Sequence, residues 1–325
     1  MLLVYPFLFG GYAASNAAQF LFSAILGLSL CFVWGYAGIL SFGQVVFYGI
    51  AGYTFGLLSL NFGSTLVTTL ALPAAVAVAT IGALVLGYFM FYGEVRDVYV
   101  TILTLVVTLV LYTFMGQTAG SEWEIGSVAL GGFNGMPAIP NLTFGVGESA
   151  LQLSGATFYW FTLLSLVAIY LGLRALVNGR LGYTMVAVRE DEDRTQMLGY
   201  DIRRVKLLVF AIGGALAGFA GVLYATWGNY INPDVFGITF ASIPVVWVTV
   251  GGRKSLLGAI VATVLIEWFR QQLAVTGSQY AIVIVGALLL GVVLLIPEGI
   301  VPWVRTRFQN ASKRSGSAER TGVAE

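Results

Sequence analysis

The stretch VKLLVFAIGGALAGFAGVLYATW, residues 205–227, decides the fold of this chain. After Lys206 it contains no charged side chain, and a helix of about 20 apolar residues is long enough to cross the hydrocarbon core of a bilayer. Comparable runs recur along the chain. They are long and continuous, unlike the alternating segments of roughly ten residues that build membrane barrels. We therefore expect an all-α polytopic bundle of transmembrane helices.

The overall composition supports this expectation. Of the 325 residues, 58% are hydrophobic and only 10% are charged, whereas a soluble domain carries about 25% charged residues. The polar side chains are too few to cover a globule that faces water on all sides. With about 20 residues per span and short connections, the length accommodates about eight to ten crossings.

Several function classes are excluded by residue types that are absent or rare. The sequence contains no histidine, the commonest general base and transition-metal ligand, which argues against catalytic zinc and a Ser-His-Asp triad. Cys31 is the single cysteine, so an intramolecular disulfide is excluded. The net charge of +1 gives no reason to expect nucleic-acid binding.

The positions of the basic residues indicate which side of the membrane each connection faces. No charged residue precedes Glu94. Most basic residues fall into two groups, one in a polar stretch and one in the C-terminal tail: Arg174, Arg180, Arg189, Arg194, Arg203, Arg204 and Lys206; and Arg305, Arg307, Lys313, Arg314 and Arg320. Because cytoplasmic connections are enriched in Lys and Arg, we expect both groups in the cytoplasm.

Successive spans must cross the membrane in opposite directions, and both basic groups are expected in the cytoplasm. Together these constraints predict about nine spans, with the N-terminus outside and the C-terminus in the cytoplasm. The expected spans are residues 17–35, 44–61, 66–92, 98–116, 155–175, 205–227, 238–252, 255–274 and 279–297. Residues 1–13 are a candidate partial or additional span, and 238–252 is short enough to be a half-helix. We divide the chain into a transmembrane domain, 1–304, and a basic cytoplasmic tail, 305–325, which we expect to be disordered.

The connection 117–154 is expected on the outer side. Its charged residues are Glu122, Glu124 and Glu148, and it contains no Lys or Arg. The turn 228–234 also lacks basic residues, so we expect it on the same outer face.

Small residues are spaced for close helix packing. Gly52 and Gly56, and likewise Gly214 and Gly218, lie four residues apart on expected spans. Small residues at this spacing allow two helix backbones to approach each other closely. We therefore interpret them as packing positions.

Glu267 and Arg270 are charged residues inside the expected span 255–274. Residues three positions apart are neighbours on a helix surface, so we expect a local ion pair near the outer end of this span. A functional role for the pair is the alternative, because ionisable residues within spans often serve function.

The polar segment 177–206 joins two spans on the expected cytoplasmic side. Within it, acidic residues open a run and a glycine closes it: Glu190, Asp191, Glu192 and Asp193 are followed by Arg194, the apolar Met197 and Leu198, and Gly199. Acidic residues in the first turn and glycine at the end are typical of a short helix, here of about nine residues. The alternative is an ordinary solvated loop of mixed charge.

A second polar interruption follows the first expected span. It contains Gly38, Ser41, Gly43 and Gln44, and Phe47 lies just beyond it. Unwound backbone at a membrane boundary is tolerated where it faces protein or a water-filled cavity, so these residues are candidates for a substrate pathway. A plain cytoplasmic turn is the alternative.

Five stretches, in the same order along the chain, match one known family. They are WGYAGILSFGQVVFYGIAGYTFGLL (34–58), GGFNGMPAIP (131–140), RLGYTMVAVREDEDRTQMLGYDIRRVKLLVF (180–210), VTVGGRKSLLGA (248–259) and PEGIV (297–301). Together they resemble the permeases of branched-chain amino-acid type ABC importers, including the urea-importer branch. Gln44 departs from the pattern, because members of the family often carry histidine there.

This resemblance implies the ABC importer permease fold in a subunit without enzymatic activity, in the cytoplasmic (inner) membrane of a bacterium or archaeon. Such permeases contact membrane lipids, pair with a second homologous permease subunit, dock two cytoplasmic ATP-binding subunits and receive substrate from an external, periplasmic solute-binding protein. The resemblance assigns the segment 177–206 to coupling with the ATPases. The residues assigned to this coupling are Arg189, Glu190, Asp191, Glu192, Asp193, Arg194, Met197, Leu198 and Gly199.

The sequence offers no nucleotide site of its own. A phosphate-binding loop requires Gly-x-x-x-x-Gly-Lys-Ser/Thr, and the nearest string, GGRKS at 251–255, places Arg253 between the last glycine and Lys254. We expect no cofactor on this chain and expect ATP and magnesium to bind the partner ATPases.

The expected substrates are branched-chain or other neutral amino acids. Urea or short amides are the alternative, because INPDVF (231–236) followed by VVWVTVGGR (245–253) also resembles the urea-importer branch. The rival from another class is a secondary transporter driven by an ion gradient. Such carriers usually need ionisable residues deep in the membrane, and the expected spans nearly lack them.

Overall fold

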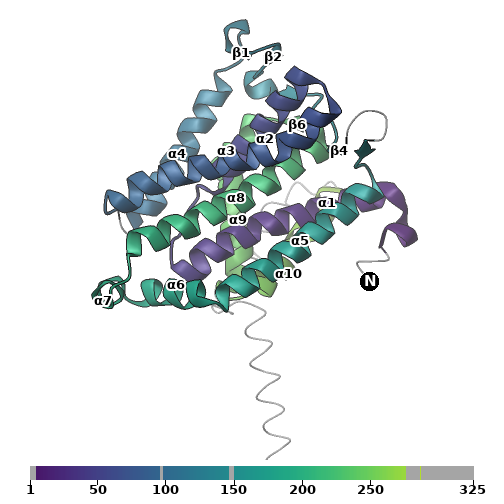
Figure 1. The fold of residues 1–325 in the computed structure, drawn as a ribbon. Helices are drawn as coiled ribbons and strands as arrows, with labels where there is room; N and C mark the ends of the chain where they lie inside the picture. The colour runs from purple at the N-terminus through teal and green to yellow at the C-terminus, as the bar shows by residue number, and fades with distance from the viewer. Residues whose placement is uncertain (1–4, 96–97, 146–149, 276–285, 287–325) are drawn as a thin grey trace, which may run out of the picture.

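The structure is a computed structural model that describes residues 5–95, 98–145, 150–275 and 286. The described helices are α1 (Tyr5–Leu30), the π-helical η1 (Cys31–Tyr36), α2 (Gln44–Phe62), α3 (Thr65–Tyr92), α4 (Val98–Gly116), α5 (Ala156–Val177), α6 (Arg180–Glu190), α7 (Glu192–Met197), α8 (Ile202–Gly228), α9 (Ile238–Gly251) and α10 (Leu256–Val275). Figure 1 shows the long helices packed side by side in one bundle.

The short elements lie in the connections. They are the strands β1 (Glu124–Ile125), β2 (Val128–Ala129), β3 (Met136–Pro137), β4 (Thr143–Phe144), β5 (Leu151–Gln152) and β6 (Tyr230–Ile231), and the 3-10 helices η2 (Ser121–Trp123), η3 (Gly132–Asn134) and η5 (Pro233–Phe236). The strands form three antiparallel pairs, β1 with β2, β3 with β6 and β4 with β5.

Within the described residues, seven helices are long and apolar enough to cross a membrane. They are Ala13–Tyr36, Gln44–Phe62, Thr65–Tyr92, Val98–Gly116, Ala156–Val177, Ile202–Gly228 and Leu256–Leu273. Each coincides with a span expected from the sequence, so the prediction of an all-α polytopic bundle is confirmed. Apart from Gly286, the expected span 279–297 lies outside the described residues, as does the whole tail 305–325.

Two regions that the sequence left open are resolved by the structure. The segment 238–252 forms α9, whose 14 residues extend about 21 Å, less than the roughly 30 Å of a hydrocarbon core. The expectation of a short helix there is confirmed. At the N-terminus, α1 already begins at Tyr5, but Gly10 interrupts it with φ 81° and ψ 168°. The candidate first span starts after this interruption, at Ala13.

The centre of the bundle is the contact of α8 with α2 and α3, and small residues make it possible. A Cβ atom added to Gly218 of α8 would lie 2.6 Å from the Cβ of Ala79 on α3. A Cβ at Gly221 would collide with the backbone carbonyl of Tyr48 on α2. The interpretation as close helix packing is confirmed for Gly214 and Gly218, whose added Cβ atoms would meet Ala83 and Ala79 of α3, but not for Gly56, which faces Met136 and Ile139 in the connection after α4.

One end of the bundle gathers the connections that were expected on the outer side. β3 in the connection between α4 and α5 pairs with β6 after α8, with Met136 opposite Ile231. Asn61 at the end of α2 donates through Nδ2 to the carbonyl of Ile125 in β1, at 2.8 Å. These contacts place the described part of the connection between α4 and α5 and the connection 229–237 on one face.

The opposite end gathers the charged connections. Glu94, after α3, lies 2.5 Å from Arg203 at the start of α8. Tyr36, at the end of η1, donates to the carbonyl of Lys254 between α9 and α10. In Figure 1, α6 and α7 lie on the side of the molecule away from β1 and β2. The division of the connections into two groups at opposite ends of the bundle, as predicted from the sequence, agrees with the structure.

We expect Gly218→Leu to destabilise the bundle by about 1–3 kcal/mol, because the added side chain has no room against Ala79. Gly172→Leu is the matched control on α5, where an added Cβ meets no atom within 4 Å. The measurement is thermal unfolding of the detergent-solubilised protein. Equal melting temperatures for the two variants would contradict this account of the packing.

Candidate functional site

The polar segment between α5 and α8 forms two helices, not one. Asp191 adopts extended backbone angles, φ −161° and ψ 105°, and its side chain accepts a hydrogen bond from the backbone N–H of Arg194 at 2.9 Å. Asp191 thereby ends α6 and caps α7. The prediction of a single helix of about nine residues opened by Glu190 is wrong, because the N-cap residue divides the acidic run.

The end of α7 agrees with the sequence pattern. Its last residue is Met197, and Gly199 adopts φ 87°, a conformation that glycine accepts without strain. Thr195 is the buried residue of α7, and its hydroxyl donates to the carbonyl of Asp191 at 2.7 Å. The predicted helix stop at Gly199 is confirmed.

The helix α6 was not predicted from the sequence. Its buried residues, Gly182, Met185 and Val188, recur every three positions and face the bundle. This spacing is the signal that could have predicted a helix packed by one face. It lay within a segment whose charges suggested exposure to water.

Arg189, at the end of α6, turns toward the first span. Its side chain is only 16% exposed, and Nη1 donates a 2.6 Å hydrogen bond to the carbonyl of Gly35 in η1. Nη2 lies 2.6 Å from the carboxylate of Glu190. The hydrogen bond and the positive charge of Arg189, together with Lys254, lower the pKa of Glu190. The guanidinium thus ties α6 to the first span while it is paired with a carboxylate.

Gly38 brings the two predicted sites together. It adopts φ 78°, and a Cβ atom there would lie 2.8 Å from Cγ of Arg189. A candidate pathway residue and a candidate coupling residue are therefore in direct contact. The reason is tertiary, because α6 packs across the turn that follows η1.

The turn between α9 and α10 also packs on η1. Cζ of Arg253 lies 4.4 Å from the centre of the Trp34 ring, a cation–π contact. Cys31 contacts the carbonyl of Arg253 at 3.4 Å, and Tyr36 donates to the carbonyl of Lys254 at 3.1 Å. The reading of residues 251–255 as a turn, not a phosphate-binding loop, agrees with this geometry.

The free end of α7 is apolar and exposed. Met197 is 87% exposed and the neighbouring Leu198 is 72% exposed. The Arg194 side chain is 81% exposed and lies 3.6 Å from Asp191. Asp193 is also exposed. Of the residues assigned to coupling, these are free to contact another protein, whereas Arg189 and Glu192 turn toward the rest of the chain.

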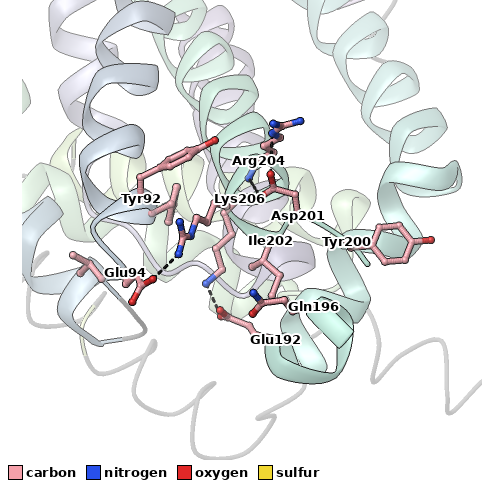
Figure 2. Close-up of a pocket in the computed structure, with 12 residues that line it drawn as sticks. Tyr92, Glu94, Glu192, Gln196, Tyr200, Asp201, Ile202, Arg204 and Lys206 are labelled. Carbon is pink, nitrogen blue, oxygen red and sulfur yellow. Dashed lines mark hydrogen bonds and ion pairs between the residues drawn. The ribbon is translucent and has the colours of Figure 1, made fainter. Parts of the chain in front are cut away.

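A pocket of about 400 Å³ lies beside α7, between the start of α8 and the end of α3. Figure 2 shows its lining, in which Tyr92 lies beside charged side chains, whereas the ring of Tyr200 points away from them. The charged residues form three pairs of opposite sign: Arg203 with Glu94, Arg204 with Asp201, and Lys206 with Glu192. The pairing leaves the pocket with no excess of either charge among these six residues.

The second predicted site, around the turn after η1, is closely packed. Ser41, Gln44 and Phe47 are all buried. Oγ of Ser41 accepts a 3.0 Å hydrogen bond from the backbone of Gly43, and Ser29 donates to Oε1 of Gln44 at 3.4 Å. Phe47 packs edge-on against Phe210, with ring centres 5.4 Å apart. The assignment of these residues to a substrate pathway stays a prediction.

The Glu267–Arg270 pair forms as the spacing predicts. Nη2 of Arg270 lies 2.6 Å from Oε2 of Glu267 on the same helix, α10. The Glu267 side chain is buried, whereas that of Arg270 is half-exposed. The prediction of a local ion pair is confirmed.

Together these features define a polytopic membrane protein with a charged helical segment anchored to the spans at one end. In the described part of the chain, no group of three or more His, Cys, Asp or Glu residues could hold a metal ion. The short helix α7 of this segment ends in the exposed apolar side chains Met197 and Leu198.

Comparison with known proteins identifies the family. Residues 12–293 match the family described as "Branched-chain amino acid transport system / permease component". Because this match covers most of the chain, the protein belongs to that family of permeases.

Curated relatives agree with this family. The chain is 29% identical to the high-affinity branched-chain amino acid transport system permease protein LivM of Escherichia coli K12, over 94% of this chain and 74% of the relative. It is 24% identical to the probable LivM permease of Methanocaldococcus jannaschii, over 86% of this chain and 90% of the relative. It is 33% identical to BraD of Pseudomonas aeruginosa, over 50% of this chain and 55% of the relative. A search of solved structures finds no significant match.

We expect Arg189→Gln to destabilise the protein by about 1.5–3 kcal/mol, because the variant loses the charged hydrogen bond to Gly35. Arg194→Gln removes an equal charge from an exposed position and is expected to change stability by less than about 0.5 kcal/mol. Thermal unfolding in detergent measures both. A larger loss for the Arg194 variant would contradict the anchoring role of Arg189.

Proposed function

We propose that this chain is the membrane-spanning permease subunit of an ATP-driven importer and that it translocates branched-chain or other small neutral amino acids. The observation that carries the proposal is the family match over residues 12–293. The exposed apolar end of α7 supports it, because an energy-coupling partner needs a surface to push against.

The proposed assembly contains four kinds of partner: a second homologous permease subunit, two ATP-binding subunits, a solute-binding protein and the surrounding lipids. ATP and magnesium bind the ATPases, and this chain carries no catalytic residue. Met197 and Leu198 would fill a groove on the ATPase, because exposed apolar side chains gain most from burial in a partner. Asp193 and Arg194 would set orientation more than affinity.

We place α6 and α7 in the cytoplasm and the connections 117–155 and 229–237 outside, in an inner membrane. The positive-inside rule supports this orientation, because basic residues cluster around α6 and the start of α8. The N-terminus is then outside and the C-terminus cytoplasmic.

Cysteine labelling tests this orientation. The native Cys31 is buried and gives little background. We expect Tyr183→Cys, at a 75% exposed position of α6, to react with a membrane-impermeant maleimide only after the cells are permeabilised. Ser121→Cys, in the exposed η2, should react in spheroplasts with an intact inner membrane. The reverse pattern would refute both the orientation and the access of an ATPase to α7.

The family and the distribution of charge both support the proposed substrate class. The relatives are named as branched-chain amino acid permeases. The described spans hold few ionisable side chains besides the internally paired Glu267 and Arg270. Such an interior suits a zwitterion or a neutral solute better than an ion.

Transport by the reconstituted assembly tests the function. We expect leucine uptake into proteoliposomes to require the ATPase subunits and ATP, and Met197→Asp with Leu198→Asp to lower that uptake at least about ten-fold, equivalent to about 1.4 kcal/mol of docking energy. The control, Met197→Leu with Leu198→Met, keeps the apolar surface and should transport normally.

Three outcomes would contradict parts of the proposal. Uptake by the chain alone in a sodium or proton gradient would indicate a secondary transporter. Uptake of urea that leucine does not compete with would reject an amino acid as the substrate. Normal uptake by the double aspartate variant would remove α7 as the docking element.

A further inference from the structure

We infer that the Glu192–Lys206 ion pair is the link through which displacement of α7 moves the long span α8. The inference rests on the proposed function and assigns positioning roles to two residues within it. Nζ of Lys206 lies 2.5 Å from Oε1 of Glu192, and Figure 2 shows the two side chains meeting between the helices.

The covalent connection between α7 and α8 is poorly suited to transmit a push. Only residues 198–201 separate the two helices, and they include Gly199 in the left-handed region. A Cβ at Gly199 would meet no atom within 4 Å, and the backbone N–H groups of Gly199 and Tyr200 donate to Gln196 and Thr195 of α7, not to α8. A second attachment is therefore needed if α7 and α8 are to move as one body.

The ion pair supplies that attachment near the start of both helices. Glu192 is the first residue of α7, and Lys206 lies in the second turn of α8. With the connection 198–201, the pair closes a loop that holds α7 at its two ends. A load on Met197 and Leu198 then reaches α8 through two points instead of one.

Burial distinguishes this pair from the others in the pocket. The Lys206 side chain is 9% exposed and that of Glu192 is 28% exposed. Nζ of Lys206 also lies 5.9 Å from the centre of the Phe91 ring. Separating this pair leaves the buried Lys206 ammonium without its partner, which is less favourable than separating an exposed pair.

The other two pairs are suited to weaker roles. Arg204 and Asp201 lie within one turn of the same helix and are largely exposed. Arg203 and Glu94 join α8 to the turn after α3, and both are partly in water. Neither of these two pairs joins α7 to α8.

The Glu192–Lys206 pair also lies next to helices of the bundle core. A small cavity beside the pair is lined by Gly38 and Ile39, so α7, α8 and the turn after the first span meet there. Farther along α8, Gly218 and Gly221 pack against α3 and α2 with almost no free space. A displacement of the start of α8 therefore changes contacts with both neighbouring helices.

The test uses the full transporter in proteoliposomes and measures ATP hydrolysis and leucine uptake in the same sample. We expect Glu192→Gln to lower the leucine transported per ATP hydrolysed at least five-fold, with normal binding of the ATPases. The exchanged pair, Glu192→Lys with Lys206→Glu, should return the ratio to within two-fold of the unmodified transporter. Arg204→Gln is the matched control and should leave the ratio unchanged.

If the variant with the exchanged charges does not fold, a covalent cross-link in place of the ion pair provides a second test. In Glu192→Cys with Lys206→Cys the ratio should fall, and a short bismaleimide that joins the two thiols should restore it. Cys31 is buried and does not compete for the reagent.

Three results would overturn the inference. The first is an unchanged ratio in Glu192→Gln. The second is a loss that neither the exchanged pair nor the cross-link restores. The third is loss of ATPase binding, which would make Glu192 a docking residue. Uptake that never depends on ATP in the unmodified transporter would instead refute the proposed function, so the two failures are distinguishable.

Discussion

The close approach of α8 to α2 and α3 is the constraint on which the rest of the structure depends. Helices in a bilayer gain little from leaving lipid, so their association relies on packing and on hydrogen bonds between them. Here Gly218 and Gly221 bring α8 almost into backbone contact with its neighbours. Tight packing over such a surface leaves few ways to move one helix alone. The span that follows the polar segment 177–206 is thus also the one most firmly engaged with the core.

Charge is concentrated at one end of the molecule, and the least exposed charges there serve attachment. Arg189 reaches the carbonyl of Gly35, and Lys206 reaches Glu192. A buried charge is tolerated when a partner satisfies it, and removing that partner is costly. The segment between α5 and α8 is therefore bound to the first span through α6 and to α8 through α7. The exposed residues at the end of α7 remain available to a partner protein.

Local pattern predicted much of this molecule. Seven spans, the short α9, the ion pair of Glu267 with Arg270 and the stop at Gly199 follow from hydropathy or from spacing of a few residues. These features depend on neighbours within one or two helical turns, so a single sequence contains the information. The same reasoning failed at Asp191, because two helices and one helix with an acidic start have similar local composition. Backbone conformation at one residue made the difference.

The sequence by itself determined that the chain is a membrane bundle, which connections share a face, and that its polar segment includes a short capped helix. Only the tertiary structure decided which charged side chains face inward. Arg189 and Arg194 are the same residue type five positions apart, yet one meets a carbonyl in a distant helix and the other faces solvent. The partner of Arg189 lies 154 positions away along the chain. Contacts at such separations depend on how helices pack, and no local pattern contains that information.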